Sequence, residues 1–341
     1  MLTERLIEDV LGRLPYLTVG VVGDLFLDRY LDLDAALAEP SLETGLDAYQ
    51  VVRVRAAPGA AGTVMNNLAA LGVGRILPLA VIGDDGEGHE LRQALDALRF
   101  VDQRHLSVTR DRRTPTYTKP MLCQAGHPPR ELNRLDIKNR SRLPADLEDR
   151  ILHSLNHLWR EVDALVVLDQ VSEEDCGVVT RRVRQRLEEL AAHDPHKFVL
   201  ADSRERIGEF RRVSLKPNER ECRRALSQAD DAPPDVLRLA QRTERPVFCT
   251  CGDQGILLAE APRVEMIPAY PVNGPIDVVG AGDATSAGIV SARAAGASLA
   301  DAAAFGCLVA SITIQQLGTT GTATPEHVRQ RWRQVQGVAH G

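Results

Sequence analysis

Short apolar runs rich in β-branched residues alternate along this chain with segments of helical spacing, and that alternation limits the folds open to it. The runs have the length and composition of strands buried on both faces, and they lie at 17–24, 76–83, 164–168, 198–202 and 246–250. The helical segments follow them, at 64–71, 87–98, 173–190 and 235–242. A β/α alternation of this kind predicts a mostly parallel sheet covered by helices on both faces.

Two stretches do not fit a buried sheet, at about 29–57 and 113–137. In each, apolar and polar residues alternate, as in Val51-Val52-Arg53-Val54-Arg55, which is typical of a half-exposed strand. We expect them to form a small β-strand lid over the carboxyl edge of the sheet, where ligands bind in open α/β folds. No repeat or linker divides the chain, so residues 1–341 are predicted to form one domain.

Composition excludes several classes of protein. The 341 residues, 44% of them hydrophobic, can bury a large core. A net charge of −6 argues against nucleic acid as a partner, since phosphate backbones require a basic face. No apolar run approaches the roughly 20 residues of a membrane-spanning helix. The acidic N-terminal pattern is unlike a secretory signal, so the chain is predicted to be cytoplasmic.

Six cysteines are scattered along the chain without the paired spacing of a metal knuckle. Cys249 and Cys251 alternate with Thr250 in an apolar, strand-like run. We therefore interpret the cysteines as small buried hydrophobic residues.

Residues 280–283 read Gly-Ala-Gly-Asp and precede a run of small residues that favours a helix. Such a turn directs several backbone N–H groups at one point, where the helix dipole adds positive potential for an anion. Asp283 would lie beside that point and could accept a proton from an attacking hydroxyl. The alternative is that Asp283 is only an N-cap.

Three other segments have the spacing of ligand-binding turns. Thr250 to Gly255 links two predicted strands, and an ordinary hairpin is the alternative. The Gly/Ala-rich turn at 58–63 opens a helix. Asn218 and Glu221 are three residues apart, so both could face a hydrated Mg²⁺, or they could simply cap a helix. Neither a Gly-x-x-x-x-Gly-Lys-Ser/Thr loop nor a Gly-x-Gly-x-x-Gly opening occurs.

Together these motifs resemble those of the ribokinase-like (PfkB) family of carbohydrate kinases, nearly end to end. Asp277 to Gly288 is similar to its C-terminal signature, with Val278 where Thr is usual; 218–221 and 250–255 resemble its Asn-x-x-Glu and Thr-x-Gly-x-x-Gly motifs. Within the family, 21–30 and 58–72 resemble bacterial heptose-7-phosphate kinases most. The resemblance implies a three-layer α/β/α sandwich, and a lid that often pairs two subunits and so predicts a homodimer.

The resemblance also implies roles at matching positions. Asp283 would be the base, and the N–H groups of Gly280, Ala281 and Gly282 the anion hole for the γ-phosphoryl group of ATP. Asn218 and Glu221 would hold Mg²⁺ through water, and the nucleotide would also meet Thr250, Gly252 and Gly255. The sugar or sugar phosphate would contact Asp24, Asp28, Gly59, Ala60, Thr63, Asn67, Lys119 and Arg134. A monovalent cation could bind near Asp277 and Val279.

The substrate turn departs from the family pattern. Family members carry Gly-Gly-x-x-Asn where this chain has Gly59-Ala60-Ala61-Gly62-Thr63, so Thr63 lacks the amide that binds sugar. The lid cations Arg53, Arg55, Lys119 and Arg134 could bind a substrate phosphate, or could be solvated charges on an edge strand. The predicted function is a sugar or sugar-phosphate kinase of the heptose type. The alternatives are a fructose-, ribose- or nucleoside-type kinase and a non-catalytic sugar- or nucleotide-binding protein.

Overall fold

The computed structural model describes residues 2–318 and 320–338. Its largest element is a sheet of nine strands in the order β14-β13-β12-β11-β10-β9-β1-β4-β5, which is parallel except for β13 and β14 at one edge. The strands are β1 (Thr18–Gly23), β4 (Arg75–Gly83), β5 (Leu106–Thr109), β9 (Ala164–Asp169), β10 (Phe198–Ser203), β11 (Ser214–Leu215), β12 (Val247–Thr250), β13 (Gly255–Glu260) and β14 (Arg263–Pro268).

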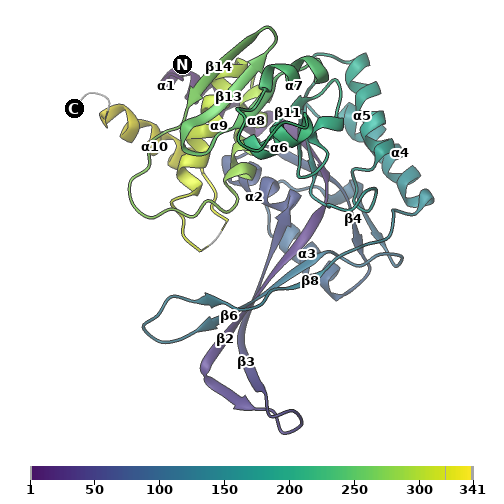
Figure 1. The fold of residues 1–341 in the computed structure, drawn as a ribbon, viewed down its shortest axis with the longest axis vertical. Helices are drawn as coiled ribbons and strands as arrows, with labels where there is room; N and C mark the ends of the chain where they lie inside the picture. Colours follow the sequence, from purple (N-terminus) through teal and green to yellow (C-terminus); the bar gives the residue numbers. More distant parts are fainter. Residues whose placement is uncertain (1, 319, 339–341) are drawn as a thin grey trace.

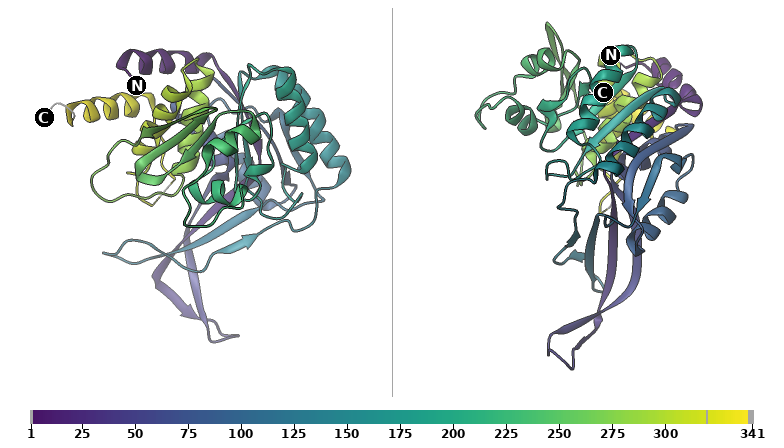
Figure 2. Two further views of the ribbon diagram at one scale, coloured as in Figure 1. Left: turned by 45° about the horizontal axis from the view of Figure 1, so that its top comes forward. Right: turned by 90° about the vertical axis from the view of Figure 1, so that its right-hand side faces the viewer.

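Helices cover both faces of this sheet (Figures 1 and 2). One face packs against α1 (Glu4–Arg13), α2 (Ala61–Leu71), α3 (Gly86–Asp96), α8 (Ala281–Ala294), α9 (Leu299–Thr313) and α10 (Pro325–Val338). The other packs against α4 (Ala145–Glu161), α5 (Arg181–His193), α6 (Glu219–Ala225) and α7 (Val236–Thr243). Short 3-10 turns lie at η1 (Leu14–Tyr16), η2 (Gln103–His105), η3 (Ile207–Glu209) and η4 (Gly252–Gln254).

Each central strand contributes side chains to both layers of the core. In β9, Val166 packs in one hydrophobic cluster and Val167 in the other, and both are fully buried. A strand covered on both faces needs apolar residues at every position, which is why these runs do not alternate. The predicted three-layer α/β/α sandwich is therefore confirmed.

A second sheet extends from the carboxyl end of β1. It contains β2 (Leu25–Pro40), β3 (Asp47–Ala60), β6 (Thr116–Cys123), β7 (Arg130–Glu131) and β8 (Leu135–Ile137). β2 pairs antiparallel with β3 and parallel with β6. The far ends of β2 and β3 project well beyond the body as an arm, which we define as residues 33–54 (Figure 1).

One predicted helix begins later than expected. The segment 173–190 was expected to be helical throughout, but α5 begins at Arg181, where the Thr180 side chain accepts a hydrogen bond from the Val183 N–H. The preceding loop is held instead by the carboxylate of Asp24, which accepts bonds from the N–H groups of Gln170, Val171 and Val178. The helical prediction was wrong for 173–180 because a long-range contact replaces local helical bonds there.

Candidate active site

Polar residues follow several parallel strands directly, and they meet at one edge of the main sheet. Asp24 follows β1, Gln170 follows β9, Arg204 follows β10 and Lys216 follows β11. A cavity of about 860 Å³ lies along this edge, and its walls include Lys216, the start of α8 and the loop after β12. A second cavity of about 50 Å³ lies beside it, and Gln170 and Arg204 line both.

The start of α8 presents free backbone donors to the large cavity. Gly280 is the N-cap and has φ 81°, a conformation that favours glycine. The Ala281 N–H donates to the Val278 carbonyl at 3.1 Å, whereas the N–H groups of Gly280, Gly282 and Asp283 have no acceptor among the described residues. These three donors and the helix dipole form a site suited to an anion.

Asp283 occupies the third position of α8 and is not its N-cap, so the simple capping interpretation is wrong. Protein surrounds the carboxylate on most sides, although it remains accessible from the cavity. Burial, and next the negative charge of Asp202, raise the pKa of Asp283 to about 7, against the lowering effect of Lys216 and Arg204. A carboxylate with a pKa near neutrality can accept a proton and release it again at physiological pH.

Lys216 and Asp202 form a buried ion pair beside this carboxylate, with 2.8 Å between Nζ and Oδ2. Burial opposes the charged form of Lys216, but Asp202, Glu221 and Asp283 together raise its pKa. Its Nζ also lies 3.6 Å from the point where a side chain on Gly282 would begin, so it faces the anion site. Sequence analysis missed both residues; the available signal was their position directly at strand ends, with Lys216 two residues before Asn218.

Asn218 and Glu221 form a capping box at the start of α6. The Glu221 N–H donates to Asn218 Oδ1 at 2.9 Å, and the Asn218 N–H donates to Glu221 Oε2 at 2.8 Å. The capping interpretation is thus correct, yet both residues also line the large cavity. Burial, followed by the charge of Asp202, raises the pKa of Glu221. Glu221 Oε1 stays outside the capping box, so an oxygen ligand of the kind Mg²⁺ prefers remains there.

The loop after β12 forms the opposite wall. Thr250, Gly252 and Gly255 all line the large cavity, and Gly255 has φ 112°. A side chain on Gly255 would lie only 2.1 Å from the Ile267 carbonyl oxygen, so a residue without a side chain is required. The remaining walls include apolar side chains suited to a flat, largely apolar group, among them Ile256, Tyr270, Pro271, Val272, Ile276, Val278 and Ile314.

The paired strands β2 and β3 place the side chain of Asp28 against Gly59. A side chain on Gly59 would lie 2.7 Å from Asp28 Oδ2, so the glycine allows the carboxylate to lie over the strand. Lys119 Nζ is 3.3 Å from Asp28 Oδ1 and donates to the Tyr30 hydroxyl at 3.2 Å. The charge of Asp28 contributes to the raised pKa of Asp283, although neither Asp28 nor Lys119 lines the large or the small cavity.

Other residues assigned to the sugar lie deeper. Asp24 is buried, and burial followed by the charge of Asp169 raises its pKa to about 6. Its carboxylate holds the 170–178 loop, so its direct role in the structure is to position Gln170. Thr63 is buried with its methyl group near Gly280, and Asn67 is fully buried and donates to the Thr63 carbonyl at 3.0 Å.

Ala60 occupies a strained backbone conformation, with φ 53° and ψ −117° at the N-cap of α2. Residues other than glycine in such regions are destabilised by about 1–3 kcal/mol. We therefore expect Ala60→Gly to raise the free energy of unfolding by about 1 kcal/mol. Urea denaturation followed by circular dichroism would measure this. Ala69→Gly, inside α2, serves as the control and should lower stability by about 0.5–1 kcal/mol; an equal loss in both variants would contradict the strain.

Three of the predicted phosphate-binding cations of the second sheet are already paired with acids. Arg55 bonds Asp32 at 2.8 Å, and Arg134 bonds Asp136 at 2.7 Å while its guanidinium lies 4.2 Å from the centre of the Tyr117 ring. Lys119 is paired with Asp28 as described. Asp277, near the predicted monovalent-cation site, accepts bonds from the N–H groups of Val279 and Gly318.

Cysteines and metal-binding clusters contribute no further site. Five of the six cysteines are buried, as expected of small hydrophobic residues, and Cys123 is half-buried; all are free thiols. In residues 2–318 and 320–338, no group of three or more His, Cys, Asp or Glu side chains could hold a metal ion. No helix in this part of the chain is long and apolar enough to cross a membrane.

Comparison with known proteins gives consistent results. Residues 30–326 match the family model described as pfkB family carbohydrate kinase. The chain is 32% identical to the bifunctional protein HldE of Caulobacter sp. (strain K31), over 98% of this chain and 66% of that protein. It therefore spans just under two thirds of the length of that relative.

Two solved structures illustrate the likeness in fold. Arabidopsis thaliana ribokinase, complexed with ribose and ATP, has a TM-score of 0.63 and 15% identity, covering 92% of this chain and 98% of that one. Escherichia coli phosphofructokinase-2, in complex with potassium, has a TM-score of 0.67 and 17% identity, covering 94% and 99%. At these identities the comparison supports the ribokinase-like fold alone.

Proposed function

The chain belongs to the pfkB family of carbohydrate kinases, and we propose that it transfers the γ-phosphoryl group of ATP to a hydroxyl of a heptose-type sugar phosphate. One observation carries the proposed mechanism. The carboxylate of Asp283, with its pKa raised to about 7, lies in one cavity with the free N–H groups of α8 and with Lys216. A base, an anion site and a cation converge there, as in-line phosphoryl transfer requires.

The proposed reaction uses this chain's residues for positioning and for one proton transfer. The acceptor oxygen attacks the γ-phosphorus in line, the bond to the β–γ bridging oxygen breaks, and ADP leaves with that electron pair. Asp283 takes the hydroxyl proton as the new O–P bond forms. The N–H groups of Gly280, Gly282 and Asp283, with Lys216, stabilise the oxygens of the phosphoryl group in transit. Ala281 would add a further N–H donor only if its bond to Val278 opened.

Asn218 and Glu221 would hold Mg²⁺ through water, and they lie in the cavity shared with Lys216 and Asp283. The oxygen donors and the unused Glu221 Oε1 fit a hydrated magnesium ion. When bound, the ion would neutralise charge on the β- and γ-phosphates. A monovalent cation near Asp277 remains part of the proposal, supported by the resemblance of that segment to the family signature.

The resemblance of segments 21–30 and 58–72 to heptose-7-phosphate kinases supports a heptose-type acceptor. Measuring ADP release over a panel of acceptors tests this specificity. The panel contains mannoheptose 7-phosphate, hexose phosphates, free hexoses, ribose and nucleosides, each with ATP and Mg²⁺. Turnover confined to phosphorylated heptoses or hexoses is expected. Turnover on ribose, fructose or nucleosides alone would support the proposed mechanism but show that the acceptor is not a heptose-type sugar phosphate. ATP binding with no turnover on any acceptor would favour a non-catalytic binding protein.

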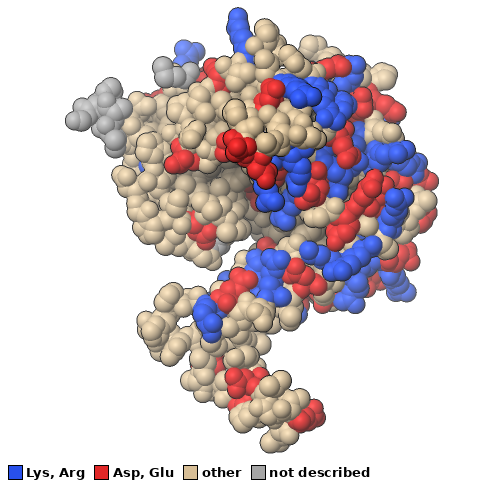
Figure 3. Space-filling view, in the orientation of Figure 1, with Lys and Arg blue, Asp and Glu red and all other residues tan. Residues whose placement is uncertain are grey.

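We also propose that two copies pair through the arm, in the cytoplasm. The arm exposes apolar side chains to solvent, including Val52 and Val54, which are 56% and 50% exposed. Figure 3 shows its lower end as largely uncharged surface with a few acidic groups. A paired β arm would bury these residues and cover unpaired strand edges.

Substitution of the arm should therefore separate the two copies. We expect Val52→Asp with Val54→Asp to convert a dimer to a monomer in analytical ultracentrifugation, because two buried charges per copy would face each other. Val264→Asp, on the edge strand β14 and 44% exposed, is the matched control and should leave the mass unchanged. A wild-type protein that sediments as a monomer at all concentrations would rule out the pairing.

A further inference from the structure

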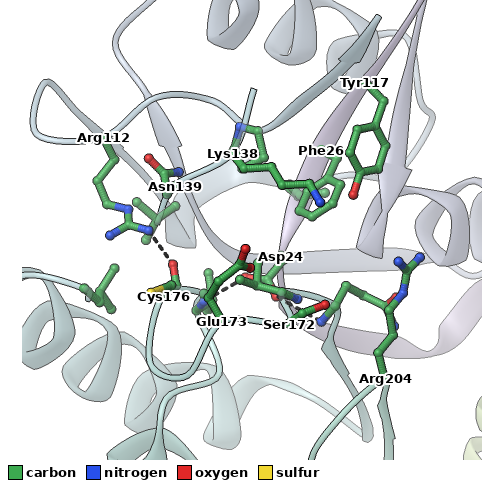
Figure 4. A pocket seen from close by; sticks show the side chains of 18 residues that line it. Asp24, Phe26, Arg112, Tyr117, Lys138, Asn139, Ser172, Glu173, Cys176 and Arg204 are labelled. Atoms are coloured by element: carbon green, nitrogen blue, oxygen red, sulfur yellow. Dashed lines mark hydrogen bonds between the residues drawn. The ribbon is translucent and has the colours of Figure 1, made fainter. Parts of the chain in front are cut away.

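The small cavity lies between the second sheet and the edge of the main sheet (Figure 4). Tyr117 and Lys138 approach it from the side of the second sheet, and Arg204 and Glu173 approach it from the main sheet. At about 50 Å³ it has room for one compact group and not for a whole sugar. Because Gln170 and Arg204 line both cavities, a group placed here would be continuous with a ligand in the large one.

Arg112 places a buried positive charge in the wall of this cavity. Its side chain is only 8% exposed, and its guanidinium donates to the backbone carbonyls of Ser141, Arg142 and Cys176. No carboxylate in the described part of the chain forms an ion pair with it. Burial lowers the pKa of Arg112, and the nearby charge of Asp24 opposes this shift without reversing it. A buried charge of this kind is costly unless an anion accompanies it.

Two further cations, Arg204 and Lys138, lie at the mouth of the small cavity, and neither forms a close ion pair within the described part of the chain. Arg204 donates from Nε to Gln170 Oε1 at 2.9 Å, a neutral partner, and forms no ion pair among the described residues. Lys138 Nζ is 3.9 Å from Asp136 Oδ2, at the limit of an ion pair, and 5.8 Å from the centre of the Tyr117 ring. Arg55, Lys119 and Arg134 differ, because each is within 3.3 Å of its own carboxylate.

The acids of the cavity do not balance these cations. The carboxylate of Asp24 is occupied by three backbone N–H groups, and its pKa is raised to about 6 by burial and then by Asp169. Glu173 is the other acidic side chain in the lining. The lining therefore contains three cations and two carboxylates, and the cavity carries a net positive charge suited to an anion.

We propose that this cavity and its mouth bind an oxyanion carried by the acceptor, through Arg204 and Lys138 with Arg112 behind them. The inference rests on the proposed function, which places the acceptor hydroxyl at Asp283. The sugar would then extend from Asp283 past Asp28 and Gln170, with its charged end between the two sheets. The ligand class is an anionic sugar, and the charged group is either a phosphate monoester or a carboxylate, both of which match the fork of an arginine.

The experiment measures binding without turnover. Calorimetry would compare mannose, mannose 6-phosphate and mannonate as probes against wild type and the variants Arg204→Gln and Lys138→Gln. Both side chains are exposed, so folding should be unaffected. We expect the wild type to bind an anionic probe at least 10-fold more tightly than mannose. Each substitution should weaken that binding about 10–100-fold, the contribution of one hydrogen bond to a charged group.

Arg130→Gln, an exposed cation of β7 in the same sheet and outside the cavity, is the matched control and should change nothing. Tighter binding of mannose 6-phosphate would identify the anionic group of the acceptor as a phosphate, and tighter binding of mannonate would identify it as a carboxylate. Equal binding of all three probes by the wild type, or a parallel loss for mannose and the anions in both variants, would overturn the inference. If the protein shows no kinase turnover but binds the anionic probe in a way that depends on Arg204, the anion-site inference stands and the proposed kinase function is rejected.

Discussion

Asp283→Asn is expected to lower kcat by about 10²–10⁴-fold, because the variant keeps the shape of the side chain and removes the proton acceptor. ADP release from ATP, Mg²⁺ and the best acceptor of the panel measures the effect. ATP affinity should change little, since the N–H donors of α8 and the loop after β12 are untouched. Asp149→Asn, an exposed carboxylate on α4, is the control and should keep wild-type turnover. Near wild-type turnover in Asp283→Asn would show that another group takes the proton.

The pH dependence gives a second test of the same residue. With a pKa of about 7, the Asp283 carboxylate is the competent base only above that pH, so kcat/KM should rise with pH and level off above about 7. A folded-state pKa above the usual 3.8 also means that folded protein binds a proton that unfolded chain has released. Stability is then lost as pH rises towards 7. Asp283→Asn should therefore raise Tm more at pH 8 than at pH 5.

Lys216→Met is expected to reduce both activity and stability. Turnover should fall about 10²–10³-fold, as when one electrostatic donor to a transition state is removed. The free energy of unfolding should fall by about 3–5 kcal/mol, because Asp202 is left as a buried carboxylate without its partner. Loss of the cation also raises the pKa of Asp283 further, so any remaining activity should need a higher pH. Urea denaturation and ADP release measure the two losses separately.

The double variant Lys216→Met with Asp202→Asn separates the structural role of Lys216 from its role in the reaction. Removing both charges leaves no isolated buried ion, so most of the stability should return. Activity should remain low, because the cation facing the anion site is still absent. Recovery of turnover together with stability would show that Lys216 only supports the fold.

The sequence predicted the fold class well because the main sheet is parallel and covered on both sides. Runs such as 164–168 are apolar at every position, so they can be identified as buried strands without knowing the order of the strands in the sheet. The sequence could not show that β10 and β11 lie side by side, and that adjacency brings Asp202 to Lys216. It likewise could not show that Asp24 holds the loop before α5, since the two are 146–154 residues apart.

Local motifs predicted which residues lie at the cavity better than they predicted the ion-pair partners of charged side chains. The sequence predicts Asp283 as the base and Asn218 and Thr250 as contacts of Mg²⁺ and the nucleotide, and the structure brings all three to one cavity. Their roles remain predictions. The lid cations show the limit, because a lysine or arginine in a sequence carries no sign of the carboxylate that neutralises it. Arg134 and Asp136 are two residues apart on an extended segment, and only coordinates show that they pair.

β2 is a single strand of 16 residues, which at about 3.3 Å per residue spans about 50 Å. It carries Asp28 at one end and the tip of the arm at the other, and β3 carries Gly59 in the same way. The hairpin thus joins the proposed acceptor site to the tip of the arm by continuous strand. A contact at the tip would shift the position of Asp28, so we expect acceptor affinity to respond to contacts that never touch the nucleotide.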